Sequence, residues 1–259
     1  MQNKGQVTIF IVVSIIVVVA TGLFFTLKGN ILPGMGTDFG KNPAGFLKNC
    51  IEDQVEEGII LISSQGGSVN PVFYQPFQFT GEDSVNISYL CFNRNDFNPC
   101  KNQMPLLMKH MKNELKTYVS DTVDECIDEL SEGLEKEGFA VETHYSRGDF
   151  DLDFDPKKVL ININAKLNLM RTDTPTIYEN FNVSIPSRIY ELGNLAREIV
   201  NQESQYCHFS TDGYHVLHPQ YQISRHITNS IKIYTLEYEN SYEKFRFAVR
   251  GCSIPAGLW

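Results

Sequence analysis

The chain has 259 residues, of which 42% are hydrophobic and 20% are charged, values that are ordinary for a globular protein. This composition excludes intrinsic disorder, a collagen-like chain and a coiled coil. The formal net charge is −9 at pH 7, which is the wrong sign for a protein that neutralises phosphates over a broad surface. We therefore expect no nucleic-acid partner.

The first predicted element is an apolar segment, residues 7–27, which carries no charged side chain. As a helix that rises ~1.5 Å per residue, it would span a bilayer core of roughly 30 Å. A buried helix of a soluble protein is the alternative, but such helices seldom hold more than ~14 consecutive apolar residues. We predict a transmembrane helix that anchors the protein in the lipid bilayer, with residues 1–6 as a cytoplasmic leader.

The cysteines indicate the orientation of this segment, because all six follow it. They are Cys50, Cys91, Cys100, Cys126, Cys207 and Cys252. An oxidising environment outside the membrane favours disulfides, so we expect a cytoplasmic N-terminus and an extracytoplasmic C-terminal domain. A secretory signal cleaved before Thr21, after the small residue Ala20, is the alternative, and it would release the domain from the membrane.

The residues before the apolar segment resemble a known leader sequence. Lys4 and Gly5 end a short basic stretch, and Gln6 precedes the apolar helix. This arrangement resembles the class III signal sequences of archaeal type IV pilin-like proteins, over residues 1–28 only. The resemblance implies cleavage between Gly5 and Gln6 by a prepilin peptidase, and it implies other pilin-like subunits as partners. Many pilins carry Glu at the fifth mature position, which is Phe10 here.

A linker and a folded domain follow the apolar segment. Residues 28–42 contain several glycines and few large apolar side chains, which predicts a flexible linker. The domain, residues 43–259, opens with Pro43 at the first position of a helix of about 20 residues. Aromatic and β-branched residues over 69–93 then indicate two strands joined near Gly81.

The later elements form blocks of helices and blocks of strands. They are a long helix over 105–138 with a possible break near Ser120, three or four antiparallel strands over 139–184, a helix over 187–205, and a hairpin of strands 231–238 and 242–250. Because these blocks lack strict βαβ alternation, the predicted fold class is α+β with antiparallel sheets.

The positions of the cysteines indicate three disulfides. Cys91 and Cys100 flank a polar turn that a disulfide would staple. Cys50 and Cys126 each lie on the apolar side of a predicted helix, and this leaves Cys207 for Cys252. Zinc ligation is the rival interpretation, although the sequence contains no Cys-x₂-Cys pair. We predict the pairs Cys50–Cys126, Cys91–Cys100 and Cys207–Cys252.

A histidine-rich segment offers a candidate metal site. His215 and His218 form a His-x-x-His pattern with Asp212 nearby, and on a helix the two imidazoles would share one face. The residues between and after them, Leu217 and Pro219 in particular, favour a loop or a strand instead. A polar loop rich in histidine and tyrosine is therefore the competing interpretation.

A second candidate cation site is the acidic run Asp149, Asp151, Asp153 and Asp155. Because the carboxylates recur every second residue, a strand would place all four on one face, where a divalent cation would relieve their repulsion. The competing interpretation is a solvated edge strand that its charge protects from further pairing.

The remaining signals concern modification and catalysis. Asn86 and Asn182 begin Asn-x-Ser sequons and could be glycosylated if they face solvent. No nucleophile elbow, zinc-protease, P-loop or dinucleotide motif is present, so we expect neither an enzyme nor a cofactor.

These patterns together predict a single-pass envelope protein of the minor-pilin or adhesin type. Its extracytoplasmic domain would bind a cell-surface protein or glycan, or other subunits. The alternatives are a membrane-tethered hydrolase that uses the histidine-rich segment, and a structural subunit of the cell envelope.

Overall fold

The computed structural model of the protein describes residues 39–40, 42–171 and 174–252. The chain divides into two units, Met1–Asn42 and Pro43–Trp259. The expected leader, the apolar segment 7–27 and most of the expected linker lie outside the described residues. Within the described ranges, no helix is long and apolar enough to cross a membrane.

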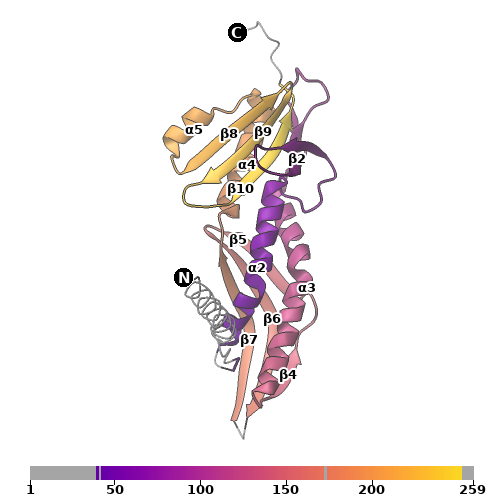
Figure 1. The fold of residues 1–259 in the computed structure, drawn as a ribbon, viewed down its shortest axis with the longest axis vertical. Coiled ribbons are helices and arrows are strands. Elements are labelled where there is room, and N and C mark those ends of the chain that lie inside the picture. Colours follow the sequence, from indigo (N-terminus) through magenta and orange to yellow (C-terminus); the bar gives the residue numbers. More distant parts are fainter. Residues whose placement is uncertain (1–38, 41, 172–173, 253–259) are drawn as a thin grey trace, which may run out of the picture. The chain divides into compact units, whose positions relative to one another are not determined.

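Two long helices, α2 (Pro43–Ser64) and α3 (Leu107–Lys136), lie side by side in the second unit (Figure 1). Each buries one stripe of residues at helical spacing, including Leu47, Ile51, Val55, Ile59 and Ile62 in α2. The expected break of the second helix near Ser120 is wrong, since α3 is continuous there. The buried stripe runs through Val119 and Val123, and this packing outweighs the modest helix propensity of serine and aspartate.

A four-stranded antiparallel sheet packs against these helices. Its strands are β4 (Ala140–His144), β5 (Phe150–Asp155), β6 (Lys158–Arg171) and β7 (Thr174–Pro186). The central strand β6 pairs with β7 on one side and with β4 and β5 on the other. Alternate residues of β6 are buried from Val159 to Leu169, so one face of the sheet meets α2 and α3 while the other stays polar.

The second sheet has six strands in the order β1-β2-β10-β9-β8, with β3 paired to β2. These strands are β1 (Tyr74–Gln78), β2 (Ser84–Phe92), β3 (Lys101–Asn102), β8 (Tyr221–Thr228), β9 (Ile231–Tyr238) and β10 (Lys244–Arg250). The pair β2–β10 is parallel, which corrects the expectation of antiparallel sheets throughout. These strands come from opposite ends of the domain, so no local pattern reveals their direction.

Helix α4 (Ile189–Tyr206) packs on one face of the second sheet, and the short helix α5 (Thr211–Leu217) lies beside β8 (Figure 1). The expectation of a loop or strand over α5 is wrong. Ser210 caps this helix, because its Oγ accepts a hydrogen bond of 3.2 Å from the backbone N–H of Gly213.

Three disulfides pair all six cysteines, and they are the pairs expected from the sequence. Cys50–Cys126 joins α2 to α3, Cys91–Cys100 closes the loop before β3, and Cys207–Cys252 joins the end of α4 to the residues after β10. The fold class is therefore mixed α+β with disulfides.

Candidate functional site

The residues of the candidate histidine site are exposed on and after α5. Asp212 and His215 lie on α5 and His218 directly follows it. The Nδ1 atom of His215 lies 3.0 Å from the carbonyl oxygen of Tyr221, and the ring of His218 packs 4.5 Å from that of Tyr214. None of the three residues lines either of the two cavities described below.

No group of three or more His, Cys, Asp or Glu side chains in the described ranges could hold a metal ion. This holds for the histidine-rich segment and for the acidic run alike. Neither candidate cation site is therefore assembled in the described part of the chain.

The acidic run lies on and beside β5, an edge strand of the four-stranded sheet. Two lysines of α3 face it: Lys112 Nζ lies 2.6 Å from Asp153 Oδ1, and Lys116 Nζ lies 3.9 Å from Asp151 Oδ1. Asp149 Oδ1 accepts a hydrogen bond of 2.9 Å from an amide side chain. Protein cations and donors thus relieve the repulsion within the run.

The two sequon asparagines, Asn86 on β2 and Asn182 on β7, are both exposed, which is the orientation that glycosylation requires. The expected processing residues, Gly5 and Gln6, lie outside the described residues.

A cleft of about 520 Å³ opens between α3, β5 and α4, and we call it the α3–α4 cleft. This volume lies in the range of ordinary ligand pockets. The cleft is lined by Met108, Lys109, Lys112 and Asn113 of α3, by Asp153 and Phe154 of β5, and by Tyr190, Asn194 and Arg197 of α4.

Helical periodicity explains which residues line this cleft. Tyr190, Asn194 and Arg197 recur at i, i+4 and i+7, so they form one stripe beside the buried apolar stripe of α4. The two helices approach closely at Gly193, where a Cβ atom would lie 2.7 Å from Sδ of Met108. A larger residue at position 193 would therefore displace Met108, which lines the cleft.

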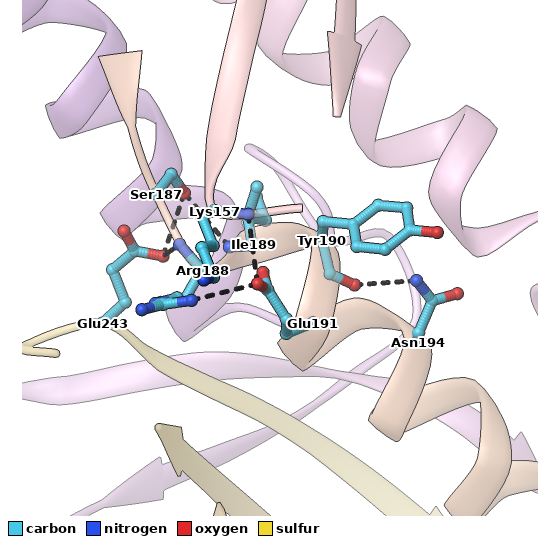
Figure 2. A network of polar contacts seen from close by, with 8 residues as sticks. All are labelled: Lys157, Ser187, Arg188, Ile189, Tyr190, Glu191, Asn194 and Glu243. Atoms are coloured by element: carbon cyan, nitrogen blue, oxygen red, sulfur yellow. Dashed lines mark hydrogen bonds and ion pairs between the residues drawn. The ribbon is translucent and has the colours of Figure 1, made fainter. Parts of the chain in front are cut away.

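A buried polar network holds the start of α4 in place (Figure 2). Glu243, only 5% exposed, accepts hydrogen bonds of 3.0 Å from Ser187 Oγ and 2.9 Å from the backbone N–H of Arg188. Arg188 also pairs with Glu191 at 3.1 Å, and Glu191 accepts a bond from the backbone N–H of Lys157. Burial raises the pKa of the Glu243 carboxyl, although the hydrogen bonds from Arg188 and Ser187 oppose this shift.

The cleft residues of α4 lie on the far side of that network. In Figure 2 the phenol ring of Tyr190 points away from Glu243 and Arg188, toward the side on which Asn194 lies. Asn194 Nδ2 donates to the carbonyl oxygen of Tyr190 at 2.9 Å, while its Oδ1 accepts from Arg197 Nη1 at 3.1 Å. The network thus fixes the helix, and the helix presents these three side chains.

The cleft concentrates positive charge on a protein whose net charge is −9. It contains Lys109, Lys112 and Arg197 against one carboxylate, Asp153, which pairs with Lys112. Within the described residues, Lys109 and Arg197 have no carboxylate partner. The cleft is therefore suited to an anionic ligand.

A smaller groove of about 360 Å³ lies between β1 and β8 and contains Phe77 and His226, whose rings are 4.9 Å apart. Beside it, the buried Arg246 binds Glu82 through hydrogen bonds of 2.6 and 2.8 Å and stacks 3.8 Å from the ring of Phe79. The Arg246 hydrogen bond lowers the pKa of Glu82. The groove is lined by one arginine, Arg225, whereas the α3–α4 cleft is lined by three cations, Lys109, Lys112 and Arg197.

The α3–α4 cleft could not be predicted from the sequence, because the residues that line it form no motif. Lys109 and Arg197 are ordinary surface cations in the sequence, and they become a site only because α3 and α4 pack together. The polar stripe at 190, 194 and 197 was the available signal, but it does not show which helix it faces.

No model of a known protein family matches the chain, and no curated protein matches it either.

Proposed function

We propose that the protein is a single-pass, membrane-anchored protein of the cell envelope whose folded domain lies outside the membrane and binds a ligand there. Residues 7–27 form the membrane anchor, with residues 1–6 as a cytoplasmic leader and 28–42 as a linker. Residues 43–259 form the extracytoplasmic domain, which acts in surface interaction or assembly as a minor pilin or adhesin does.

One observation carries this proposal: all six cysteines are paired within the folded domain. Stable structural disulfides are typical of oxidising compartments and rare in the cytosol. The boundary between the two units, at Asn42 and Pro43, coincides with the end of the proposed linker. The 7–27 segment lacks any charge and is long enough for a bilayer core, which supports anchoring.

The pilin-like part of the proposal rests on Lys4, Gly5 and Gln6, the residues that resemble a class III signal sequence. On this proposal, a prepilin peptidase cleaves before Gln6 and leaves the apolar helix intact. The helix then remains in the membrane or packs with the helices of other pilin-like subunits.

The proposal is tested by determining the mature N-terminus of protein recovered from cells that make it naturally. Intact mass and N-terminal peptide mapping distinguish three results. A start at Gln6 supports prepilin-type processing. A start at Met1 supports a membrane anchor and overturns the proposed cleavage before Gln6. A start near Thr21 overturns the anchor, because the domain would then be secreted free.

A second measurement tests the compartment directly. Protein denatured without a reductant is treated with a thiol-specific reagent, and the modified cysteines are counted by mass. We expect no modified cysteine. Modification of all six cysteines would place the domain in a reducing compartment and overturn the extracytoplasmic location.

A further inference from the structure

We propose that the α3–α4 cleft binds an anionic saccharide, one that carries carboxylate or sulfate groups. This inference deepens the proposed function and rests on it, because it names the class of ligand that the extracytoplasmic domain binds. Four features carry it: the size of the cleft, its excess of cations, its aromatic rings and its side-chain amides.

The charge of the cleft selects an anion. Lys109 and Arg197 stand on different helices, and within the described residues neither is paired with a carboxylate. Arg197 is already oriented, since it donates to Asn194. An anionic group bound between the two helices would receive charge-assisted hydrogen bonds from both cations, which are about twice as strong as neutral ones.

The other lining residues select a saccharide. The rings of Phe154 and Tyr190 are half-buried and offer flat apolar faces, against which the C–H face of a sugar ring packs well. Asn113 and Asn194 offer amides, which can both donate to and accept from sugar hydroxyls. A volume of about 520 Å³ accommodates a small ligand of one or two sugar rings.

An acidic peptide fits this cleft less well. Peptides gain much of their affinity from backbone hydrogen bonds to an exposed strand edge or groove. Two of the three walls here are helices, α3 and α4, whose backbone groups are bonded within each helix. The third wall is the edge strand β5, whose exposed carboxylates, Asp151 and Asp153, repel an acidic peptide that would pair with it. Recognition therefore depends on side chains, which matches a ligand with many hydroxyls and few amides.

The test uses the full-length protein in detergent micelles and isothermal titration calorimetry. The probes are oligogalacturonate, hyaluronate and heparin oligosaccharides, with a neutral galactose oligosaccharide and a short polyglutamate as comparisons. We expect binding of at least one anionic saccharide, weaker binding as salt rises, and no binding of the neutral saccharide.

Variants locate the site. Lys109→Gln and Arg197→Gln should each weaken binding about tenfold or more. Tyr190→Ala should weaken it too, while Tyr190→Phe should bind nearly as well as the wild type because it keeps the ring. The matched control is Lys136→Gln, which removes an exposed lysine at the far end of α3 and should not change the affinity. Thermal melting of each variant shows that the fold is retained.

Several outcomes would overturn the inference. The first is that no anionic saccharide binds. The second is that polyglutamate binds as tightly as the anionic saccharides or more tightly. The third is that Lys136→Gln lowers the affinity for the saccharide as much as Arg197→Gln does. Failure of the proposed function is separate, since it is read from the mature N-terminus and the thiol state. If the mature protein starts at Gln6 but binds no anionic saccharide, only the saccharide proposal is overturned. If the protein binds an anionic saccharide but has six free thiols, only the extracytoplasmic location is overturned.

Discussion

Gly58 of α2 faces Leu115 of α3 so closely that a Cβ atom at position 58 would lie 2.6 Å from Cδ1 of Leu115. The same atom would lie 2.7 Å from Cδ1 of Tyr118. Leu115 is completely buried, so it has little room to move. The missing side chain of Gly58 therefore sets the spacing between the two long helices.

Gly58→Ala should destabilise the protein by up to about 2 kcal/mol. The added methyl improves helix propensity by about 1 kcal/mol. Overpacking a tight core typically costs about 1–3 kcal/mol, which equals or exceeds that gain. Urea unfolding gives the free energy of unfolding. Leu115→Ala is the companion variant. It should lower the free energy of unfolding by about 1 kcal/mol less in the Gly58→Ala background than in the wild type, because it removes the crowded side chain. If the two effects were simply additive, the close contact would be contradicted.

The disulfide Cys50–Cys126 should stabilise the fold more than Cys91–Cys100 does. Their sequence separations are 76 and 9 residues, and a longer closed loop removes more entropy from the unfolded chain. We expect losses of about 4.5 kcal/mol for the double alanine variant at the first pair and about 2.5 kcal/mol at the second. Denaturant unfolding of both variants checks this order, and a reversed order would contradict it.

Glu203 should be essential for stability. Its carboxylate is completely buried in α4 and accepts hydrogen bonds from Lys232 and Tyr234 of β9, and the side chain of Lys232 is only 11% exposed. Glu203→Ala should cost about 3–5 kcal/mol, because it leaves the ammonium of Lys232 without its counter-charge. The exposed Glu198→Ala on the same helix should cost less than about 1 kcal/mol.

A double variant separates the buried charge from packing in this contact. Glu203→Met with Lys232→Met removes both charges and keeps the volume, so it should cost less than Glu203→Ala alone. A double variant as unstable as the single one would mean that packing around position 203, rather than the lone charge, causes the loss.

Glu243→Gln should stabilise the protein more at pH 8 than at pH 4. Burial raises the pKa of Glu243, so the folded state holds this proton more tightly than the unfolded chain does. The wild type therefore loses stability as pH rises from the unfolded pKa through the folded one, and glutamine does not. The glutamine Oε1 can still accept from Ser187 and Arg188.

Melting temperatures across pH 4–8 measure this difference. The control is Glu239→Gln, an exposed carboxylate in the turn before β10. A difference between Glu243→Gln and the wild type that stays constant with pH would show that the buried carboxyl does not titrate in this range.

The local parts of the fold were predictable because their patterns lie within single elements. The apolar stripe from Leu47 to Ile62 gave α2, and the alternation through β6 gave a one-faced strand. The N-cap at Ser210 and the strand β8 were missed, because α5 is short and exposed and no residue of β8 is buried. The parallel pair β2–β10 and the α3–α4 cleft depend on contacts between distant segments, which a local pattern does not encode.

The disulfide near the start of α2 has a mechanical consequence. Tension applied at Pro43, where an anchored protein would be pulled, reaches Cys50 before the rest of α2 and passes through the covalent bond to Cys126. From there the load runs along α3 toward Met108 and the mouth of the cleft. The shortest covalent path from Pro43 to a ligand held at the cleft would thus run through one disulfide and one helix, and it would bypass the remainder of α2.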